Sequence, residues 1–260
     1  MGCIKLDILD KQYKRTELRV SYREKELTSN FFTVNGRRDT LVNFIDPDGR
    51  DAYHFDENGN FVKKYKEKGE HYGVIEAKAG GTATTFKFAD PKNDPKSIDD
   101  GKITRAVIVP NESINEALTN SGVFDKSNQN NKRDYILNES NASSLNGTGK
   151  MDYVVTADFS INGEKQKGLY DNTLYVTKTE SGYTGHNNYN FGNFLWGAGA
   201  SALGFWKITA RAGAHLNNWL NDPANVGIPW YQSYKRSWDS KDDQRSISIG
   251  VDWMKQNRKK

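Results

Sequence analysis

The chain has 260 residues, of which 27% are charged and 35% hydrophobic, so we expect one large or two small domains with a modest core. Its net charge of +4 is mildly basic, which gives only weak support for a polyanionic partner. The single cysteine, Cys3, excludes an intramolecular disulfide and a cysteine-based zinc site, and we expect no cofactor and no metal.

The first half of the chain has the pattern of short strands separated by turns. Asp46-Pro47-Asp48-Gly49 is a strong turn signal, because proline presets φ and glycine accepts a positive φ. Alternating apolar residues on both sides of 57–60 predict a hairpin there. Further strands are predicted at 16–22, 30–34, 84–90 and 103–109.

The middle of the chain contains the best candidate for a boundary. A helix is expected to begin near Asn111 or Ser113 and to run through Leu118. Residues 121–149 are polar and rich in Asn and Ser, with a possible short helix at 133–137, which is typical of a linker.

The second half of the chain begins with strands and ends with helices. Asn162-Gly163 lies between the alternating runs 151–160 and 169–179, which predicts a second hairpin. Beyond Gly185 the pattern becomes helical. Strands first and helices last indicate an α+β fold with short antiparallel strands in the N-terminal half.

The segment between Glu180 and Lys207 contains no Asp, Glu, Lys or Arg. Small residues recur four positions apart in it, which lets another backbone approach a helix closely. Its asparagines would need hydrogen-bond partners that lipid cannot provide, so we expect no stable membrane insertion. Two interpretations remain: a tightly packed buried helix, or a helix that presents Asn193 and Trp196 on one face to a cleft.

Four segments in the second half resemble polymorphic toxin type 44 domains (bacterial toxin 44). They are MDY at 151–153, YNFGNFLWGAGASALGF at 189–205, ARAGAH at 210–215 and DSKDDQRSISIG at 239–250, in the order found in that family. The likeness covers residues 139–260 and implies a helical toxin-like domain preceded by a β-hairpin. The chain departs from the family where the late motif lacks its proline, and where a glutamine after Ala-Gly is not evident, so that His215 or Asn217 stands near its place.

A second resemblance lies upstream. FIDPDGRDAYHFDENGNF at 44–61 is similar to the end of an RHS-repeat core of the Bacteroidetes type followed by one tyrosine-aspartate repeat, although the repeats that would build a shell are missing. Together the resemblances predict an RHS-core-like remnant at 1–60, a β-rich connector at 61–138 and the toxin-like domain at 139–260.

The candidate site residues come from the motifs and from the chemistry that cleavage of a polymer requires. A base with a pKa near neutrality, acids that orient a nucleophile, and cations and aromatic rings that bind the substrate are the usual components. The catalytic candidates are His215, Asp242, Asp243, Gln244 and Asp152, and the substrate-binding candidates are Asn193, Trp196, Arg211, Lys235 and Arg236.

The resemblance implies an antibacterial toxin or effector module, associated with RHS repeats, that takes part in interbacterial competition. Type 44 domains are regarded as nucleases, so a hydrolase acting on nucleic acid, with RNA favoured, is the first hypothesis. A peptidoglycan hydrolase is the second, with Glu139 and Asp152 as its carboxyl pair, and a non-enzymatic binding module is the third. A cognate immunity protein is the expected partner. The N-terminus has no signal-peptide pattern, so secretion or delivery to a target cell would need a specialised secretion system.

Overall fold

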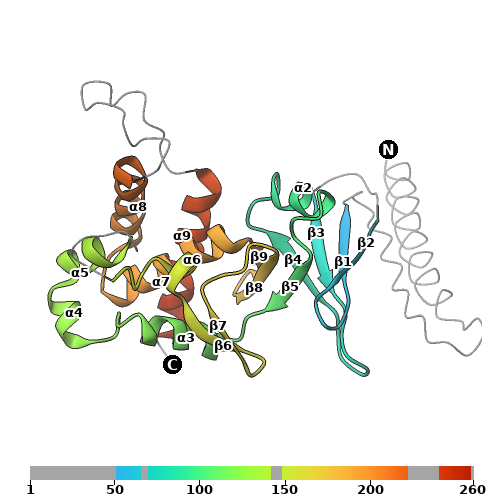
Figure 1. Cartoon of the computed structure of the whole chain (residues 1–260), viewed down its shortest axis with the longest axis horizontal. Coiled ribbons are helices and arrows are strands. Elements are labelled where there is room, and N and C mark those ends of the chain that lie inside the picture. Colours follow the sequence, from blue (N-terminus) through green and yellow to red (C-terminus); the bar gives the residue numbers. More distant parts are fainter. Residues whose placement is uncertain (1–50, 66–69, 142–147, 222–239, 259–260) are drawn as a thin grey trace, which may run out of the picture. The chain divides into compact units, whose positions relative to one another are not determined.

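The computed structural model describes residues 51–65, 70–141, 148–221 and 240–258, with side chains described up to residue 215 in the third range (Figure 1). Backbone contacts divide the chain into two units, Met1–Ile45 and Asp46–Lys260, and the described residues all belong to the second. The strands predicted at 16–22 and 30–34, the turn at 46–49, and Lys235 and Arg236 lie outside the described residues.

A seven-stranded mixed sheet forms one part of this unit, and its strands come from distant parts of the sequence (Figure 1). Strands β1 and β3, β4 and β9, and β5 and β8 pair in parallel, whereas the other neighbours are antiparallel. In the order β2-β1-β3-β4-β9-β8-β5, the strands are β2 (Phe61–Tyr65), β1 (Ala52–Phe55), β3 (Tyr72–Ile75), β4 (Thr84–Phe88), β9 (Gly182–His186), β8 (Thr173–Thr179) and β5 (Arg105–Ile108).

The two outer strands of the sheet meet where β2 begins. Phe61 N donates to Thr104 O at 2.8 Å, and Ala106 N donates to Gly59 O at 2.8 Å. Gly59 has φ +83°, and a Cβ atom there would lie 2.1 Å from Ala106 O, so only glycine permits this approach. The contact encloses an apolar core that includes Tyr53, Phe55, Ile75, Phe86, Phe88 and Leu174.

The first predicted hairpin is confirmed, and its turn has a local cause. Asp56 Oδ1 accepts hydrogen bonds from Asn58 N at 2.9 Å and from Asn60 N at 2.7 Å, which closes the chain between β1 and β2. The second hairpin has its turn where predicted, since Asn162 and Gly163 both have positive φ, at 53° and 83°.

The strands flanking that second turn were predicted wrongly. They are β6 (Asp158–Ile161) and β7 (Glu164–Lys167), whereas β8 pairs with β5 and β9. Residues 153–156, expected to be extended, form the short helix α6 (Tyr153–Thr156). The fully buried Tyr153 explains this, because its hydroxyl lies 2.8 Å from Ser121 Oγ and fixes the segment on the core.

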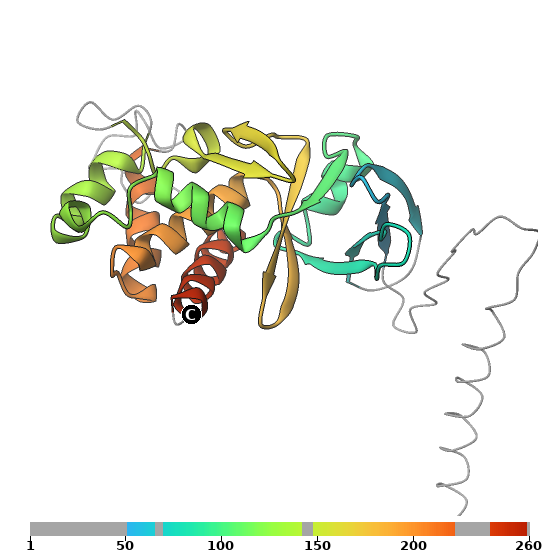
Figure 2. The same cartoon turned by 90° about the horizontal axis from the view of Figure 1, so that it is seen from below.

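Helices form the other part of the unit, centred on α7 (Asn188–Ala202), against which α9 (Lys241–Asn257) packs along its length (Figure 2). Cβ atoms at Gly197 and Gly250 would lie 2.3 Å from Ile247 O and 1.9 Å from Phe194 O. The predicted close approach of a second backbone is therefore confirmed. The remaining helices are α2 (Asp94–Asp99), α3 (Asn111–Asn120), α4 (Lys126–Asn130), α5 (Lys132–Glu139) and α8 (Lys207–Asn221).

The α+β class is confirmed, and α7 is buried within the fold. Over the described residues, no helix is both long enough and apolar enough to cross a membrane. The predicted boundaries at 60 and 138 do not interrupt the sheet, since β1, β4 and β9 belong to three different predicted ranges. The assignment of 1–60 to an RHS-core-like remnant, 61–138 to a connector and 139–260 to a toxin-like domain stays a prediction.

Candidate functional site

Residues from three of the four toxin-like motifs meet near the start of α9. Asn193 Nδ2 on α7 donates to Asp243 Oδ1 on α9 at 2.6 Å. Arg211 Nε on α8 donates to Gln244 Oε1 at 3.0 Å, and Gln244 Nε2 donates back to Arg211 O at 3.2 Å. We refer to Asn193, Arg211, Asp242, Asp243 and Gln244 as the helix-end cluster.

The first turn of α9 explains how this cluster is positioned. Ser240 is the N-cap of the helix, and its Oγ accepts from Asp243 N at 3.2 Å while it donates to Asp243 Oδ2 at 2.5 Å. Each carboxylate oxygen of Asp243 thus has a donor, one from the cap and one from Asn193. This acidic turn therefore forms the N-terminal cap of α9, and the same geometry holds the Asp243 carboxylate against the amide of α7.

Asp94 borders this cluster and was missed by sequence reasoning. Its Oδ1 accepts from Asn187 Nδ2 at 2.7 Å, and Asn187 is the N-cap of α7. The pKa of Asp94 is raised to about 7, mainly by burial and in smaller part by the nearby carboxylates of Asp90 and Asp242, while the hydrogen bonds from Asn187 and from Asp90 N lower it. Residues 89–101 are polar and rich in Pro and Asp, which is typical of a loop, and no local signal in them indicates a buried carboxyl group.

Trp196 occupies a different environment from the one proposed for a stacking residue. Its indole is 9% exposed, and Nε1 donates to Ser140 Oγ at 2.8 Å. The ring lies against α8, since a Cβ atom at Gly213 would be 3.6 Å from its Cη2. Tyr189, one helical turn before Asn193 on the same face of α7, is 66% exposed and offers the accessible ring at this position.

His215 and Asp152 lie on elements that adjoin the cluster. His215 is four residues after Arg211 on α8, so the two side chains share a face of that helix. Asp152 precedes α6, whose Val154 side chain contacts α7 so closely that a Cβ atom at Gly192 would lie 2.6 Å from it. The alternative acid Glu139 accepts hydrogen bonds from Thr148 N, Thr148 Oγ1 and Lys150 N at 2.9–3.0 Å.

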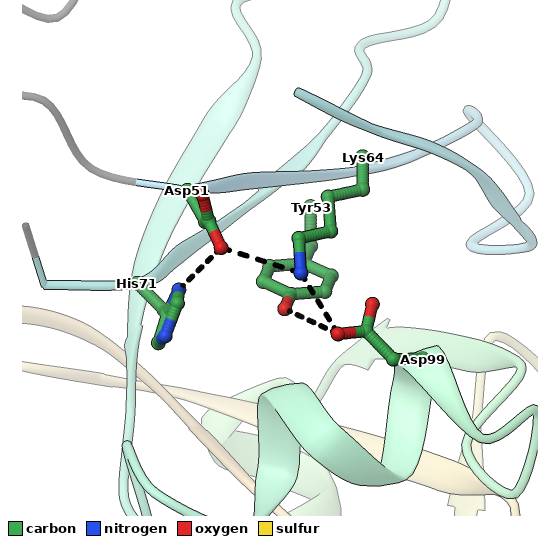
Figure 3. Close-up of polar contacts among 5 residues, drawn as sticks. All are labelled: Asp51, Tyr53, Lys64, His71 and Asp99. Atoms are coloured by element: carbon green, nitrogen blue, oxygen red, sulfur yellow. Dashed lines mark hydrogen bonds and ion pairs between the residues drawn. The ribbon is translucent and has the colours of Figure 1, made fainter. Parts of the chain in front are cut away.

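A second polar group, the sheet cluster, was not anticipated from the sequence (Figure 3). Lys64 Nζ lies 3.2 Å from Asp51 Oδ2 and 2.8 Å from Asp99 Oδ2. His71 Nδ1 lies 3.2 Å from Asp51 Oδ2, and Tyr53 OH donates to Asp99 Oδ2 at 3.3 Å. The cluster joins β1, β2 and α2 with the start of β3 at one point.

In the sheet cluster both carboxylates share the ammonium group of Lys64, and the pKa shifts reflect this pairing. Burial raises the pKa of the Tyr53 hydroxyl. Burial alone would lower the pKa of Lys64, but its hydrogen bonds to Asp99, Tyr53 and Asp51 raise it above its ordinary value. Lys64 therefore stays an ammonium group, which suits an ion pair and not a nucleophile or a base.

The chemistry available at the helix-end cluster is that of carboxylates, amides and a guanidinium group. Within the described part of the chain, no group of three or more His, Cys, Asp or Glu side chains is arranged to hold a metal ion. No protein-family model, curated protein or solved structure matches this chain.

Proposed function

We propose that the chain is an antibacterial toxin module that hydrolyses nucleic acid, with RNA favoured, at the helix-end cluster. The observation that carries the proposal is the convergence of motif residues separated by up to 51 positions, from Asn193 to Gln244, into two hydrogen-bonded pairs that meet at adjacent residues of α9. Helix packing alone does not require an amide, a guanidinium group and two acids at one place. Cleavage of a phosphodiester uses all of these.

Each side chain has a role that its position allows. The amide of Asn193 holds the Asp243 carboxylate in one orientation, from which it can accept a proton or orient a nucleophile. Arg211 offsets the negative charge that develops on a phosphate, and Gln244 fixes its guanidinium group. His215, on the face of α8 that carries Arg211, is the proposed base.

Tyr189 provides the reason to favour nucleic acid. An exposed ring one turn from Asn193 can stack on a base, while Arg211 binds the neighbouring phosphate. Lys235 and Arg236 keep their proposed role as further phosphate-binding residues.

A peptidoglycan hydrolase is the second candidate, and one observation favours it. Glycoside hydrolysis needs a carboxylic acid with a raised pKa close to a second carboxylate. Asp94, with its pKa raised by burial to about 7, and its neighbour Asp242 form such a pair. This pair replaces Glu139 and Asp152, because the carboxylate of Glu139 binds the 148–150 loop.

Expression in bacteria tests the proposal. The parent chain should be toxic in the cytoplasm and leave degraded RNA, whereas Asp243→Asn and His215→Ala should remove the toxicity without lowering the melting temperature. Asp252→Asn is the matched control, because Asp252 lies on the same helix but pairs with Lys207 at the surface. Lysis that appears only after export to the periplasm would favour the peptidoglycan hydrolase. If neither compartment shows killing, both enzyme hypotheses are wrong and the non-enzymatic binding module takes their place.

A further inference from the structure

The carboxyl group of Asp94 lies where the beginnings of α7 and α9 approach α2. Asp94 is 1% exposed, and the fold places it beside segments that lie far away in the sequence. Asn187, which donates to it, caps α7, and Asp242, which interacts with it through charge, lies in the first turn of α9. Asp94 thus contacts the structural start of the helix that carries Asn193.

A continuous set of hydrogen bonds runs from Asp94 into α7. Asp94 Oδ1 accepts from Asn187 Nδ2 at 2.7 Å, and Asn187 Oδ1 accepts from Asn190 N at 2.9 Å. The other carboxyl oxygen, Oδ2, accepts from Asp90 N at 3.2 Å. Because an asparagine amide has one carbonyl and one NH₂ group, the bond to Asp94 determines which end of Asn187 caps the helix.

We propose that Asp94 is a positioning residue of the helix-end cluster, and that the proton on its carboxyl group controls how firmly the first turns of α7 and α9 are held. The inference rests on the proposed function only in assigning a substrate to the cluster. The control by the proton follows from the contacts of Asp94 itself.

The charged groups around Asp94 explain why its proton matters. Asp90 precedes it on its own segment, and Asp242 faces it from α9. On α9, the guanidinium group of Arg245 donates to Ala89 O at 2.6 Å. His186, next to Asn187, is buried and uncharged, because burial lowers its pKa to about 3.

The neutral form of Asp94 therefore suits this environment better than the carboxylate does. Burial raises its pKa to about 7, so the group changes charge close to neutrality. Above that pH the buried carboxyl group carries a charge that burial disfavours, and this charge is also repelled by Asp90 and Asp242, so the packing around Asp94 is weakened. The first turns should be held firmly at pH 6 and less firmly at pH 8.

The titration of the carboxyl carbons by NMR, on the full chain, tests the first half of the inference. The Asp94 carbon should titrate near pH 7, about three units above an ordinary aspartate. In Asp242→Asn the midpoint should fall, because one like charge is gone, whereas the surface variant Asp252→Asn should leave it unchanged. A midpoint below about pH 5 in the parent chain would overturn the proposal, because such a value is typical of an ordinary aspartate.

Amide hydrogen exchange at pH 6 and pH 8, corrected for the intrinsic pH dependence, tests the second half. The amides of Asn190, Phe191 and Asp243 report on the two first turns. Their protection should fall about tenfold from pH 6 to pH 8, because a closed-state pKa near 7 and an ordinary pKa in the open state make closure about one power of ten less favourable over that interval. In Asp94→Asn the fall should disappear. Equal protection at both pH values in the parent chain would overturn the proposal, whether or not the chain proves toxic.

Discussion

The two polar parts of this protein both contain carboxylates, but the carboxylates have different partners in the two. In the sheet cluster, each of the carboxylates Asp51 and Asp99 has the ammonium group of Lys64 within 3.2 Å. In the helical part, Asp243 faces the amide of Asn193 and Asp94 faces the amide of Asn187. Asp94 also lies near two other carboxylates, and among the described residues no ion pair compensates for them.

On the proposed function, the difference separates a group that stabilises the fold from one that takes part in the chemistry. Carboxylates that share an ammonium group have a partner of opposite charge, and such a pair holds strands together. Carboxyl groups that are buried near like charges have raised pKa values, and such perturbed groups gather at functional sites. Their cost in stability must be offset elsewhere, and the close packing of α7 on α9 through Gly197 and Gly250 is the clearest compensating feature.

The largest expected effect comes from breaking that packing. Gly197→Leu would place a side chain where even a Cβ atom lies 2.3 Å from Ile247 O, so α7 and α9 must separate. We expect the free energy of unfolding to fall by about 3 kcal/mol or more, at the upper end of the cost of overpacking. Urea denaturation measures this.

Gly213→Ala is the matched control for that substitution. A Cβ atom there lies 3.6 Å from the Trp196 ring, which is an ordinary contact, and alanine has a higher helix propensity than glycine. This variant should be as stable as the parent chain or slightly more stable. If both glycine substitutions leave the denaturation midpoint unchanged, the close helix contact does not support the cluster.

The next effect concerns pH and the buried His186, which lies 3.3 Å from Thr177 Oγ1 and from Ser246 Oγ. Burial lowers its pKa in the folded state to about 3, below the value of about 6.5 in the unfolded chain. The unfolded state therefore binds the proton first, and the stability that is present above pH 6.5 is lost as the pH falls toward 3. Between pH 7 and pH 4 we expect this group to remove about 2–3 kcal/mol.

Denaturation at both pH values, in the parent chain and in His186→Gln, checks this. The variant should lose less stability on acidification than the parent does. Asp94 acts with the opposite sign, because its raised folded pKa gives stability below about pH 4 that is lost as the pH rises through 7. Asp94→Asn should therefore lose more stability on acidification, and identical slopes in the three proteins would contradict both assignments.

A smaller effect is expected in the sheet cluster. Lys64→Met leaves Asp51 and Asp99 without their shared ammonium group, and the side chain of Lys64 is only 22% exposed. We expect a loss of about 1–2 kcal/mol, because the site is partly screened by solvent. Lys165→Met is the control, since its pair with Asp158 is 72% exposed on the lysine side and should contribute less than about 0.5 kcal/mol. Equal losses in the two variants would show that the cluster has no special stability.

The smallest effect on stability is expected at Tyr189, where the effect on binding should be large. Tyr189→Ala should change the free energy of unfolding by less than about 0.5 kcal/mol, because the ring is 66% exposed. Affinity for a single-stranded RNA oligonucleotide should fall by about 1–3 kcal/mol, the usual contribution of one stacked base. Fluorescence anisotropy measures this, with Trp206→Ala, 80% exposed beyond the other end of α7, as the control. Equal losses of affinity in both variants would remove Tyr189 from the proposed site.

Much of the local structure could be predicted from the sequence, because its causes are local. The turn at 57–60 depends on Asp56 and a glycine, and the start of α9 depends on Ser240 and the acids that follow it. The resemblance to the toxin family also identified Asn193, Asp243 and Gln244 as candidates, and the structure places these residues close to one another. The strands at 151–160 and 169–179 were assigned wrongly as partners, because alternation shows that a segment can be a strand but not which strand it pairs with.

By itself, the sequence determined the α+β class, the turns at 57–60 and 162–163 and the small residues that let a second helix approach α7, since each depends on residues within a few positions of one another. Only the tertiary structure decided that β8 and β9 complete a sheet begun at β1, and that Asp94 meets Asn187 across 93 residues. It also decided that Trp196 faces Ser140 and not solvent. The physical reason is that burial and the charge of neighbouring side chains depend on which distant elements pack together, and these two quantities set the protonation state and the accessibility of a site.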